Sequence, residues 1–249
     1  MHNTTRLRAH QYGIIAFASI ALVALAGCGD VQSSAASPSS APASDAPSVS
    51  LSLEQRMIDA IETGDVAAAQ AVLEEGLSPD APLGGTAADP FMPLHRAAGA
   101  DQAGIVSLLI EAGATVDATT GGLTPLMLAS SSGSVDTIQA LLDGGADPTL
   151  PNFKYYGLSA WHYAARDGNI PALQTFLDWG VDVDYQDTTY GTAVSWAAGS
   201  GQAEAVEFLI AAGADLNLRD TTTTTPLGWA IAGGFTEVAE MLEAAGGVL

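Results

Sequence analysis

The sequence predicts an all-α solenoid of about six helix-turn-helix repeats joined by β-turn fingers. Two independent markers recur along the chain with the same spacings of 32, 35, 33 and 33 residues. The first marker opens a short helix at Met92, Thr124, Ser159, Thr192 and Thr225, and the second closes a helix at Gly113, Gly145, Gly180, Gly213 and Gly246. Aromatic residues make up only 6% of the chain. Such a composition suits short, closely packed helices, and a fixed period of this length is typical of stacked repeats.

The beginning of the chain is typical of a secretory leader. Arg6 and Arg8 precede an uncharged apolar run at residues 14–25, which is short for a membrane span but suits a signal-peptide core. The Leu-Ala-Gly-Cys stretch at 25–28 then resembles the lipobox of bacterial lipoproteins. This resemblance implies cleavage before Cys28, the single cysteine, and lipid on its thiol. The alternative is an ordinary secretory signal with an incidental cysteine.

The stretch after Cys28 is rich in Ser, Ala and Pro and lacks hydrophobic periodicity, which predicts a disordered tether. A lipid on Cys28 would place the chain in the cell envelope, facing the periplasm. In enteric bacteria, an acidic residue directly after the lipidated cysteine retains a lipoprotein in the inner membrane. Here Gly29 holds that position and Asp30 comes next, which favours the outer membrane. The predicted parts are a lipoprotein signal peptide at 1–27, a tether at 28–50 and a repeat domain at 51–249.

The repeats lie near residues 53–80, 92–118, 124–150, 159–186, 192–218 and 225–249. Their openings, such as Thr-Pro-Leu-Met-Leu-Ala at 124–129, resemble the T-P-L-H-x-A motif of the ankyrin repeat. Thr and Pro suit the first turn of a helix, and a mid-repeat glycine suits its left-handed end. These glycines are Gly133, Gly168, Gly201 and Gly234. The first and last repeats carry acidic outer faces and are predicted to be caps. Insertions at 81–90 and 151–158 are predicted to lengthen loops.

No combination of residues in the sequence suggests catalysis, so the chain is predicted to be non-enzymatic and to need no cofactor. His95 and His162 hold the same motif position, and the resemblance implies that they order loops by hydrogen bonding. Four aspartates could suggest a ladder of metal ligands. Each recurs at the close of a repeat, however, where aspartate caps a turn, so no metal site is predicted. These aspartates are Asp117, Asp147, Asp182 and Asp215.

The resemblance implies that a partner meets the fingers and the exposed face of the inner helices. That face is mostly small residues, with Arg166 and Asp167 as its polar centre. Large aromatic side chains, which are good interface anchors, fall on the fingers. The finger residues are Phe91, Phe153, Tyr155, Tyr156 and Tyr190. The alternative is that Phe153 and Tyr156 pack the inserted loop against the solenoid.

A second aromatic stripe occupies the x position of the opening motif. Its members are Tyr163, Trp196 and Trp229, and Leu128 holds the same position in an earlier repeat. The stripe could stack against a ligand, but an apolar residue at this position usually packs between repeats, which favours the core. Trp161 replaces the motif leucine and is predicted to be buried.

The chain carries 28 acidic and 7 basic residues, for a net charge of −21. This charge argues against nucleic acid and against electrostatic binding to an anionic membrane surface. It favours a basic partner, unless it only maintains solubility. The predicted function is a membrane-tethered, monomeric envelope protein that binds another envelope protein through its concave face and fingers. The alternatives are an acidic inhibitor or immunity protein for a cationic toxin or hydrolase, and an accessory factor for a periplasmic stress-defence enzyme.

Overall fold

The computed structural model describes residues 51–86, 89–132 and 134–249, apart from the side chains of 86, 89 and 132. Contacts divide the chain into two units, Met1–Ser48 and Val49–Leu249, and the described residues belong to the second. The predicted leader, the lipidation site Cys28 and the tether lie outside the described residues, as does the predicted helix-ending Gly133.

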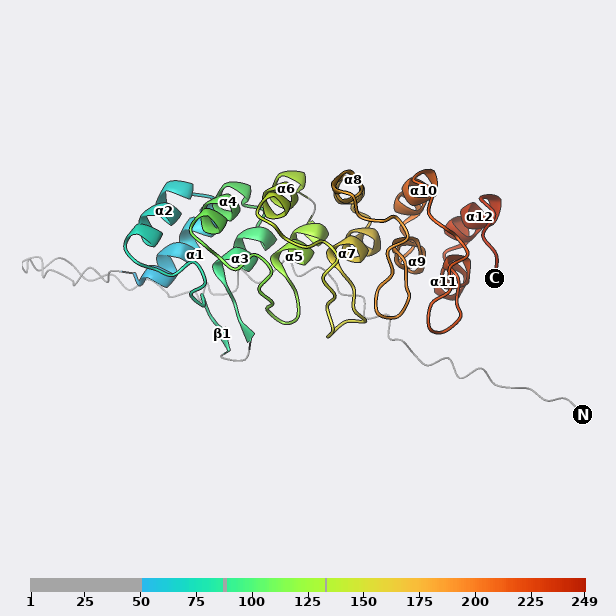
Figure 1. Ribbon diagram of the computed structural model, residues 1–249, viewed down its shortest axis with the longest axis horizontal. Coiled ribbons are helices and arrows are strands. Elements are labelled where there is room, and N and C mark those ends of the chain that lie inside the picture. The colour runs from blue at the N-terminus through green and yellow to red at the C-terminus, as the bar shows by residue number, and fades with distance from the viewer. Residues whose placement is uncertain (1–50, 87–88, 133) are drawn as a thin grey trace, which may run out of the picture. The chain divides into compact units, whose positions relative to one another are not determined.

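Six pairs of helices and one short hairpin make up the described residues (Figure 1). The pairs are α1 (Leu53–Thr63) with α2 (Val66–Glu74), α3 (Pro93–Gly99) with α4 (Ala103–Glu111), α5 (Pro125–Ser132) with α6 (Val135–Asp143), α7 (Ala160–Asp167) with α8 (Ile170–Trp179), α9 (Ala193–Gly199) with α10 (Ala203–Ala211), and α11 (Pro226–Gly233) with α12 (Thr236–Ala244). In the hairpin, β1 (Gly85–Thr86) pairs antiparallel with β2 (Asp89–Pro90). The predicted helical solenoid of six repeats is confirmed.

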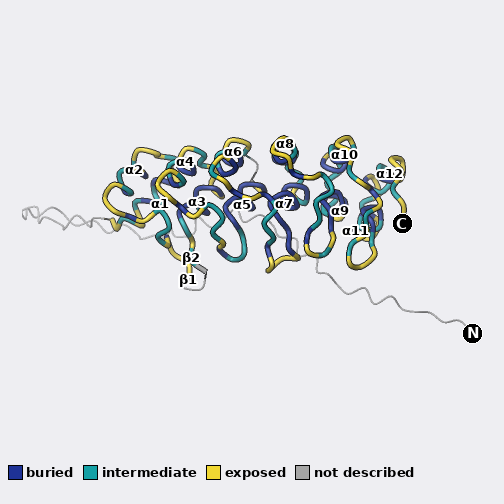
Figure 2. The backbone as a smooth tube through the Cα atoms, in the orientation of Figure 1, coloured by how far each residue is buried: buried dark blue, intermediate teal, exposed yellow. Residues whose placement is uncertain are grey.

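The helices form two layers. The odd-numbered helices pack against one another in sequence order, from α1 to α11, and the even-numbered helices do the same from α2 to α12. The fingers extend from the side of the odd-numbered layer, away from the even-numbered helices (Figure 1). Buried residues face the interior between the layers, whereas the finger tips and the outer sides of the even-numbered helices are exposed (Figure 2).

The helix ends follow the local signals in the sequence. The Thr192 side chain accepts a hydrogen bond from the Ser195 N–H at the start of α9, and Thr225 does the same for the Gly228 N–H at the start of α11. Each bond satisfies an N–H group that the first turn leaves without a partner in the helix. Gly168 ends α7 at φ 74°, a left-handed conformation that glycine adopts without steric cost. These contacts confirm the predicted caps at these positions.

Both helix layers contribute large and small side chains to the core, and buried alanines recur on the odd-numbered helices. Ala164 and Ala165 on α7 are fully buried, which lets neighbouring helices approach closely. Trp161 is also fully buried, as predicted, and its ring meets the edge of Phe176 on α8 at 6.5 Å between centroids. The acidic residues of α12 stay exposed, in keeping with a capping repeat.

Candidate partner-binding surface

The two sequence insertions form loops, and they lie on different fingers. The first forms the β1–β2 hairpin, which Phe91 closes by donating its N–H to Gly84 O at 3.0 Å. The second forms the finger at 152–158, where the Asn152 N–H donates to Leu158 O at 2.9 Å. The first precedes α3 and the second precedes α7, so Phe91 lies two repeats away from Phe153, Tyr155 and Tyr156, and three repeats away from Tyr190, whose finger precedes α9.

The aromatic side chains of the fingers at 152–158 and 187–191 are exposed. Phe153 is 81% exposed, Tyr156 52% and Tyr190 59%. The alternative that Phe153 packs against the solenoid is therefore wrong. Tyr156 keeps half of its surface exposed while its ring lies 6.2 Å from that of Trp196, between centroids, at a tilt of 40°. The fold thus brings Tyr156 together with a member of the second aromatic stripe.

The tips of three successive fingers hold left-handed backbone conformations without glycine. Tyr156 has φ 56°, Tyr190 has φ 62° and Thr223 has φ 63°. This conformation costs an L-residue roughly 1–2 kcal/mol, because its Cβ approaches the following carbonyl oxygen. The earlier finger uses Gly122, at φ 85°, in the left-handed region. Residues in such unfavourable backbone conformations cluster at functional sites, and two of these three are exposed tyrosines.

A buried carboxylate organises the finger at 187–191. Asp187 Oδ1 accepts hydrogen bonds from the Thr189 N–H at 2.6 Å and the Gly191 N–H at 3.0 Å. Its Oδ2 accepts the indole N–H of Trp196 at 2.7 Å. The carboxylate therefore fixes both the finger and the orientation of the indole on α9.

The next finger repeats this arrangement one repeat later. Asp220 Oδ1 accepts the N–H groups of Thr222 and Thr224, and Oδ2 accepts the indole N–H of Trp229 at 2.9 Å. Both units share the pattern D-T-T-x-x-T-x-x-x-W, at 187–196 and 220–229. This pattern is the sequence signal by which the carboxylate–indole pairs could have been found.

The second aromatic stripe links helices to fingers. Tyr163 is buried, as predicted, and its hydroxyl accepts a hydrogen bond from the Asn152 amide at 3.1 Å. Trp196 and Trp229 are only partly buried, although Trp196 packs against the core, so the interpretation of the stripe as core holds fully for Tyr163 and in part for Trp196. At all three positions, a polar residue at the start of a finger bonds the aromatic residue of the following helix.

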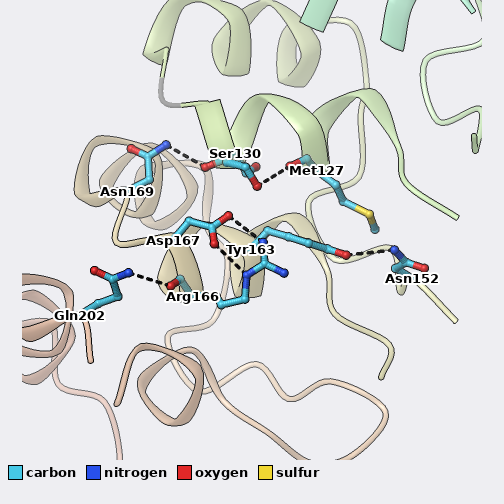
Figure 3. A network of polar contacts seen from close by, with 9 residues as sticks. Met127, Ser130, Asn152, Tyr163, Arg166, Asp167, Asn169 and Gln202 are labelled. Atoms are coloured by element: carbon cyan, nitrogen blue, oxygen red, sulfur yellow. Dashed lines mark hydrogen bonds and ion pairs between the residues drawn. The ribbon is translucent and has the colours of Figure 1, made fainter. Parts of the chain in front are cut away.

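Arg166 and Asp167 lie at the end of α7 and form an ion pair with each other. The Nε and Nη2 of Arg166 donate to the two Asp167 carboxylate oxygens at 2.8 Å each (Figure 3). The Arg166 guanidinium also lies over the Tyr163 ring, 4.5 Å from its centroid. Burial lowers the pKa of Arg166, but Asp167 and Tyr163 outweigh it and hold the pKa above its usual value. The predicted polar centre therefore exists as an internally neutralised pair.

Neighbouring fingers are bonded to one another. The Thr188 hydroxyl donates to Tyr156 O at 2.8 Å, and the Thr221 N–H donates to Thr189 O at 2.8 Å. These bonds connect the fingers of the last three repeats into one surface. Binding to such a surface costs less conformational entropy than binding to independent loops.

His95 and His162 each form a hydrogen bond that connects a helix to a finger. The Nε2 of His95 contacts Leu123 O at 3.1 Å, and the Nε2 of His162 contacts Tyr185 O at 3.1 Å, so each bonds the finger that follows its repeat. His162 Nδ1 accepts the Ser159 N–H at 3.2 Å. Burial lowers the pKa of His162 to about 4. His162 is therefore neutral at neutral pH, with its proton on Nε2.

The repeat-closing aspartates act within turns. Asp147, Asp182 and Asp215 each accept the backbone N–H of the residue two positions later, as predicted for turn caps. Asp117 differs, because it accepts the Asp147 N–H of the next repeat at 3.3 Å. Within the described residues, no group of three His, Cys, Asp or Glu is placed to hold a metal ion. The same part of the chain contains no helix with the length and hydropathy of a membrane span.

Comparison with known proteins identifies the repeats. A family model described as ankyrin repeats (3 copies) matches residues 57–152 and 161–247. Among solved structures, the human ASB11 ankyrin repeat domain is 26% identical with a TM-score of 0.67, covering 78% of this chain and 84% of that one. The ankyrin repeat domain of Bcl-3, a member of the IkappaB protein family, is 25% identical with a TM-score of 0.65, covering 78% and 86%. This chain belongs to the ankyrin-repeat family.

Relatives with curated descriptions share only part of their length with this chain. Ankyrin repeat protein nuc-2 of Neurospora crassa is 36% identical over 108 residues, which are 43% of this chain and 10% of that protein. Neurogenic locus notch homolog protein 1 of Danio rerio is 36% identical over 97 residues, which are 38% of this chain and 4% of that protein. This chain therefore spans a small fraction of these relatives. The ankyrin repeats make it a protein with a domain for protein–protein interaction.

Proposed function

We propose that this chain is a lipid-anchored protein of a bacterial cell envelope that binds another envelope protein through its aromatic fingers. The observation that carries the binding surface is the exposure of Phe153, Tyr155, Tyr156 and Tyr190 on two adjacent fingers. Aromatic side chains with few rotatable bonds are frequent anchors of interfaces. The lipobox-like stretch ending at Cys28 supports the anchor, and the Ser/Ala/Pro-rich segment after it supports a tether.

The concave face contributes less binding energy in this proposal than the fingers do. Gly99, Ser131, Gly199 and Ala232 hold equivalent positions on successive odd-numbered helices and offer little side-chain surface. Arg166, at the same position on α7, is already bonded to Asp167. A partner would therefore rest on a floor of small residues and take its specific contacts from the fingers.

Removing the finger tyrosines is expected to abolish partner capture from an envelope fraction without loss of the fold. The variant carries Tyr155→Ala with Tyr156→Gly and Tyr190→Gly. Glycine is chosen at the last two positions because it adopts their left-handed φ values without steric cost. Truncating central aromatic anchors costs about 2 kcal/mol or more each, so even two of them weaken binding by a factor of several hundred.

A matched control changes exposed apolar residues on the even-numbered helices instead. Val66, Val135 and Trp179 are 40%, 41% and 47% exposed and lie on α2, α6 and α8. Their joint replacement by alanine is expected to leave capture unchanged. Equal capture by wild type and the finger variant, with both folded by circular dichroism, would exclude the fingers as the interface.

The Cys28→Ser variant is expected to move from the membrane fraction to the soluble fraction after cell disruption. Acyl chains on Cys28 supply the membrane affinity in this proposal, because several chains on one residue anchor firmly. Detergent phase partitioning and immunoblotting provide the measurement. A Gly29→Asp variant is the control, because it keeps the cysteine and is expected to remain in the membrane fraction. Membrane association of the Cys28→Ser variant at the wild-type level would contradict the anchor.

A further inference from the structure

The fourth repeat contains a contact between a cation and an aromatic ring that the fifth and sixth repeats lack. In the fourth repeat, the guanidinium of Arg166 lies over the ring of Tyr163, 4.5 Å from its centroid (Figure 3). The two residues are three positions apart on α7, so they lie on the same face of one helix. A cation over an aromatic face is attracted by the negative potential of the ring. This pair shows which chemical group fits above the aromatic stripe.

The next two repeats have the aromatic ring but not the cation. Trp196 and Trp229 hold the position of Tyr163, while Gly199 and Ala232 hold the position of Arg166. Both tryptophans are partly exposed. A Cβ built on Gly199 would meet only Trp229, at 3.6 Å, which is ordinary van der Waals contact. The position from which an arginine reaches the ring in the fourth repeat is therefore occupied by a small residue in the fifth and sixth.

The surroundings of these tryptophans favour a cation. The indole N–H groups of Trp196 and Trp229 donate to Asp187 and Asp220, respectively, so that each ring adjoins a negative charge. A hydrogen bond from the indole to a carboxylate increases the electron density of the ring, which strengthens its attraction for a cation. The ring of Tyr156, 6.2 Å from that of Trp196, adds a second aromatic wall. Tryptophan is also the aromatic residue that binds cations best.

The charge of the chain supports a partner that supplies this cation. The sequence has 28 acidic and 7 basic residues. Within the part of the chain that the structure describes, three arginines are bonded to carboxylates, in the pairs Arg56–Glu75, Arg96–Glu62 and Arg166–Asp167. Excess negative charge attracts a positively charged partner over a Debye length and raises its association rate.

We propose that Trp196 and Trp229 form a ladder of cation-binding sites for arginine or lysine side chains from a basic segment of the partner protein. Each indole would receive a cation from the partner in the way that Tyr163 receives Arg166. This proposal rests on the proposed function, because it assigns the chemistry of the partner that the fingers bind. Tyr156 and Tyr190 would flank the segment, and Asp187 and Asp220 would hold the indoles in place.

The test uses the full chain in detergent and a short amidated peptide of Gly-Ser-Arg triplets as the probe. Binding is followed by calorimetry and by tryptophan fluorescence. The matched peptide replaces each arginine by citrulline, which has nearly the same shape but no charge. The arginine peptide is expected to bind about tenfold more tightly, and this difference is expected to shrink as the ionic strength rises. Equal affinity for the two peptides would overturn the proposal.

A second test supplies the cation beside each tryptophan from the chain itself. The Gly199→Arg, Ala232→Arg double variant places a guanidinium three positions after each tryptophan, as Arg166 follows Tyr163. It is expected to bind the arginine peptide about tenfold more weakly. The Gly199→Gln, Ala232→Gln variant has long neutral side chains and is expected to retain the wild-type affinity. Equal affinity of the arginine and glutamine variants, both folded by circular dichroism, would overturn the proposal.

The two proposals can fail separately. If the envelope partner is lost by the finger variant but is captured equally by the arginine and glutamine variants, the fingers bind the partner and the cation ladder is wrong. If the arginine peptide binds as expected while the finger variant still captures the partner, the ladder stands and the assignment of the fingers is wrong.

Discussion

Replacing Trp161 by alanine is expected to lower the free energy of unfolding by about 3–5 kcal/mol, the range found when a large buried aromatic side chain is deleted. Trp161 is fully buried on α7, in the fourth of six repeats. Its ring meets that of Phe176 on α8 edge to face, with an interplanar angle of 78°. The substitution therefore leaves a cavity between the two helices of a central repeat, where flanking repeats on both sides limit collapse.

The indole nitrogen of Trp161 provides a control for this prediction. Within the described residues, Trp161 Nε1 is buried and has no hydrogen-bond partner. The side chain therefore stabilises the repeat through its volume and apolar area, and its polar atom contributes nothing favourable. A Trp161→Phe variant keeps most of the ring and removes the unpaired N–H, so it is expected to lose only about 1 kcal/mol.

Urea denaturation followed by circular dichroism measures both variants. Because each repeat contacts only its neighbours, a weakened central repeat also reduces cooperativity between the two halves of the solenoid. The alanine variant is therefore expected to show a lower midpoint and a shallower transition, whereas the phenylalanine variant keeps the wild-type slope. Equal losses for the two variants would mean that the indole N–H, and not the ring volume, determines the contribution of Trp161.

The repeat period and the local signals predicted most of the fold. Thr192 and Thr225 begin helices because a threonine side chain can accept the N–H three residues later, and this contact depends only on local sequence. Gly168 and Gly234 end helices because they adopt positive φ without cost. Trp161 was predicted to be buried because it replaces the motif leucine. Each of these features depends on residues within one repeat.

The candidate surface was predicted in part. The exposure of Phe153 and Tyr190 follows from their positions in loops, which lie on the surface. The link from Asp187 to Trp196 was not predicted, although the repeated D-T-T-x-x-T-x-x-x-W pattern is its sequence signal, because the hydrogen bond itself spans nine positions through the finger. The left-handed φ of Tyr190 was also missed, since tyrosine gives no local signal for that conformation. Contacts between fingers, such as Thr188 with Tyr156, depend on how repeats stack.

The stability of the repeat domain is expected to fall by about 3 kcal/mol between pH 7 and pH 4 through His162 alone. Burial lowers the pKa of His162 from 6.5 to about 4, although Asp187 opposes this shift. In the unfolded chain the imidazole takes up a proton near pH 6.5, while in the folded chain it stays neutral until about pH 4. The unfolded state therefore binds more protons between these values, and stability rises with pH across this range. Each unit of pKa difference corresponds to about 1.4 kcal/mol.

The geometry explains why His162 resists protonation. Its Nδ1 accepts the Ser159 N–H at 3.2 Å, and its Nε2 donates to Tyr185 O at 3.1 Å. A proton on Nδ1 would replace the acceptor that Ser159 requires by a donor, in a position that water does not reach. The neutral imidazole therefore connects the start of α7 to the segment that leads into the finger at 187–191. Protonation at Nδ1 would break the hydrogen bond from the Ser159 N–H at the start of α7, while Nε2 would still donate to Tyr185 O.

A His162→Gln variant isolates the contribution of this histidine from that of the many carboxylates. The glutamine amide can donate to Tyr185 O but does not titrate, so the carboxylates titrate alike in the two proteins. Urea denaturation at pH 7 and at pH 4 is expected to show that the wild type loses about 3 kcal/mol more than the variant. A proton bound to His162 in the folded protein at pH 5.5, observed by NMR of the imidazole, would contradict the lowered pKa. Equal pH dependence of wild type and variant would assign the acid sensitivity to the carboxylates.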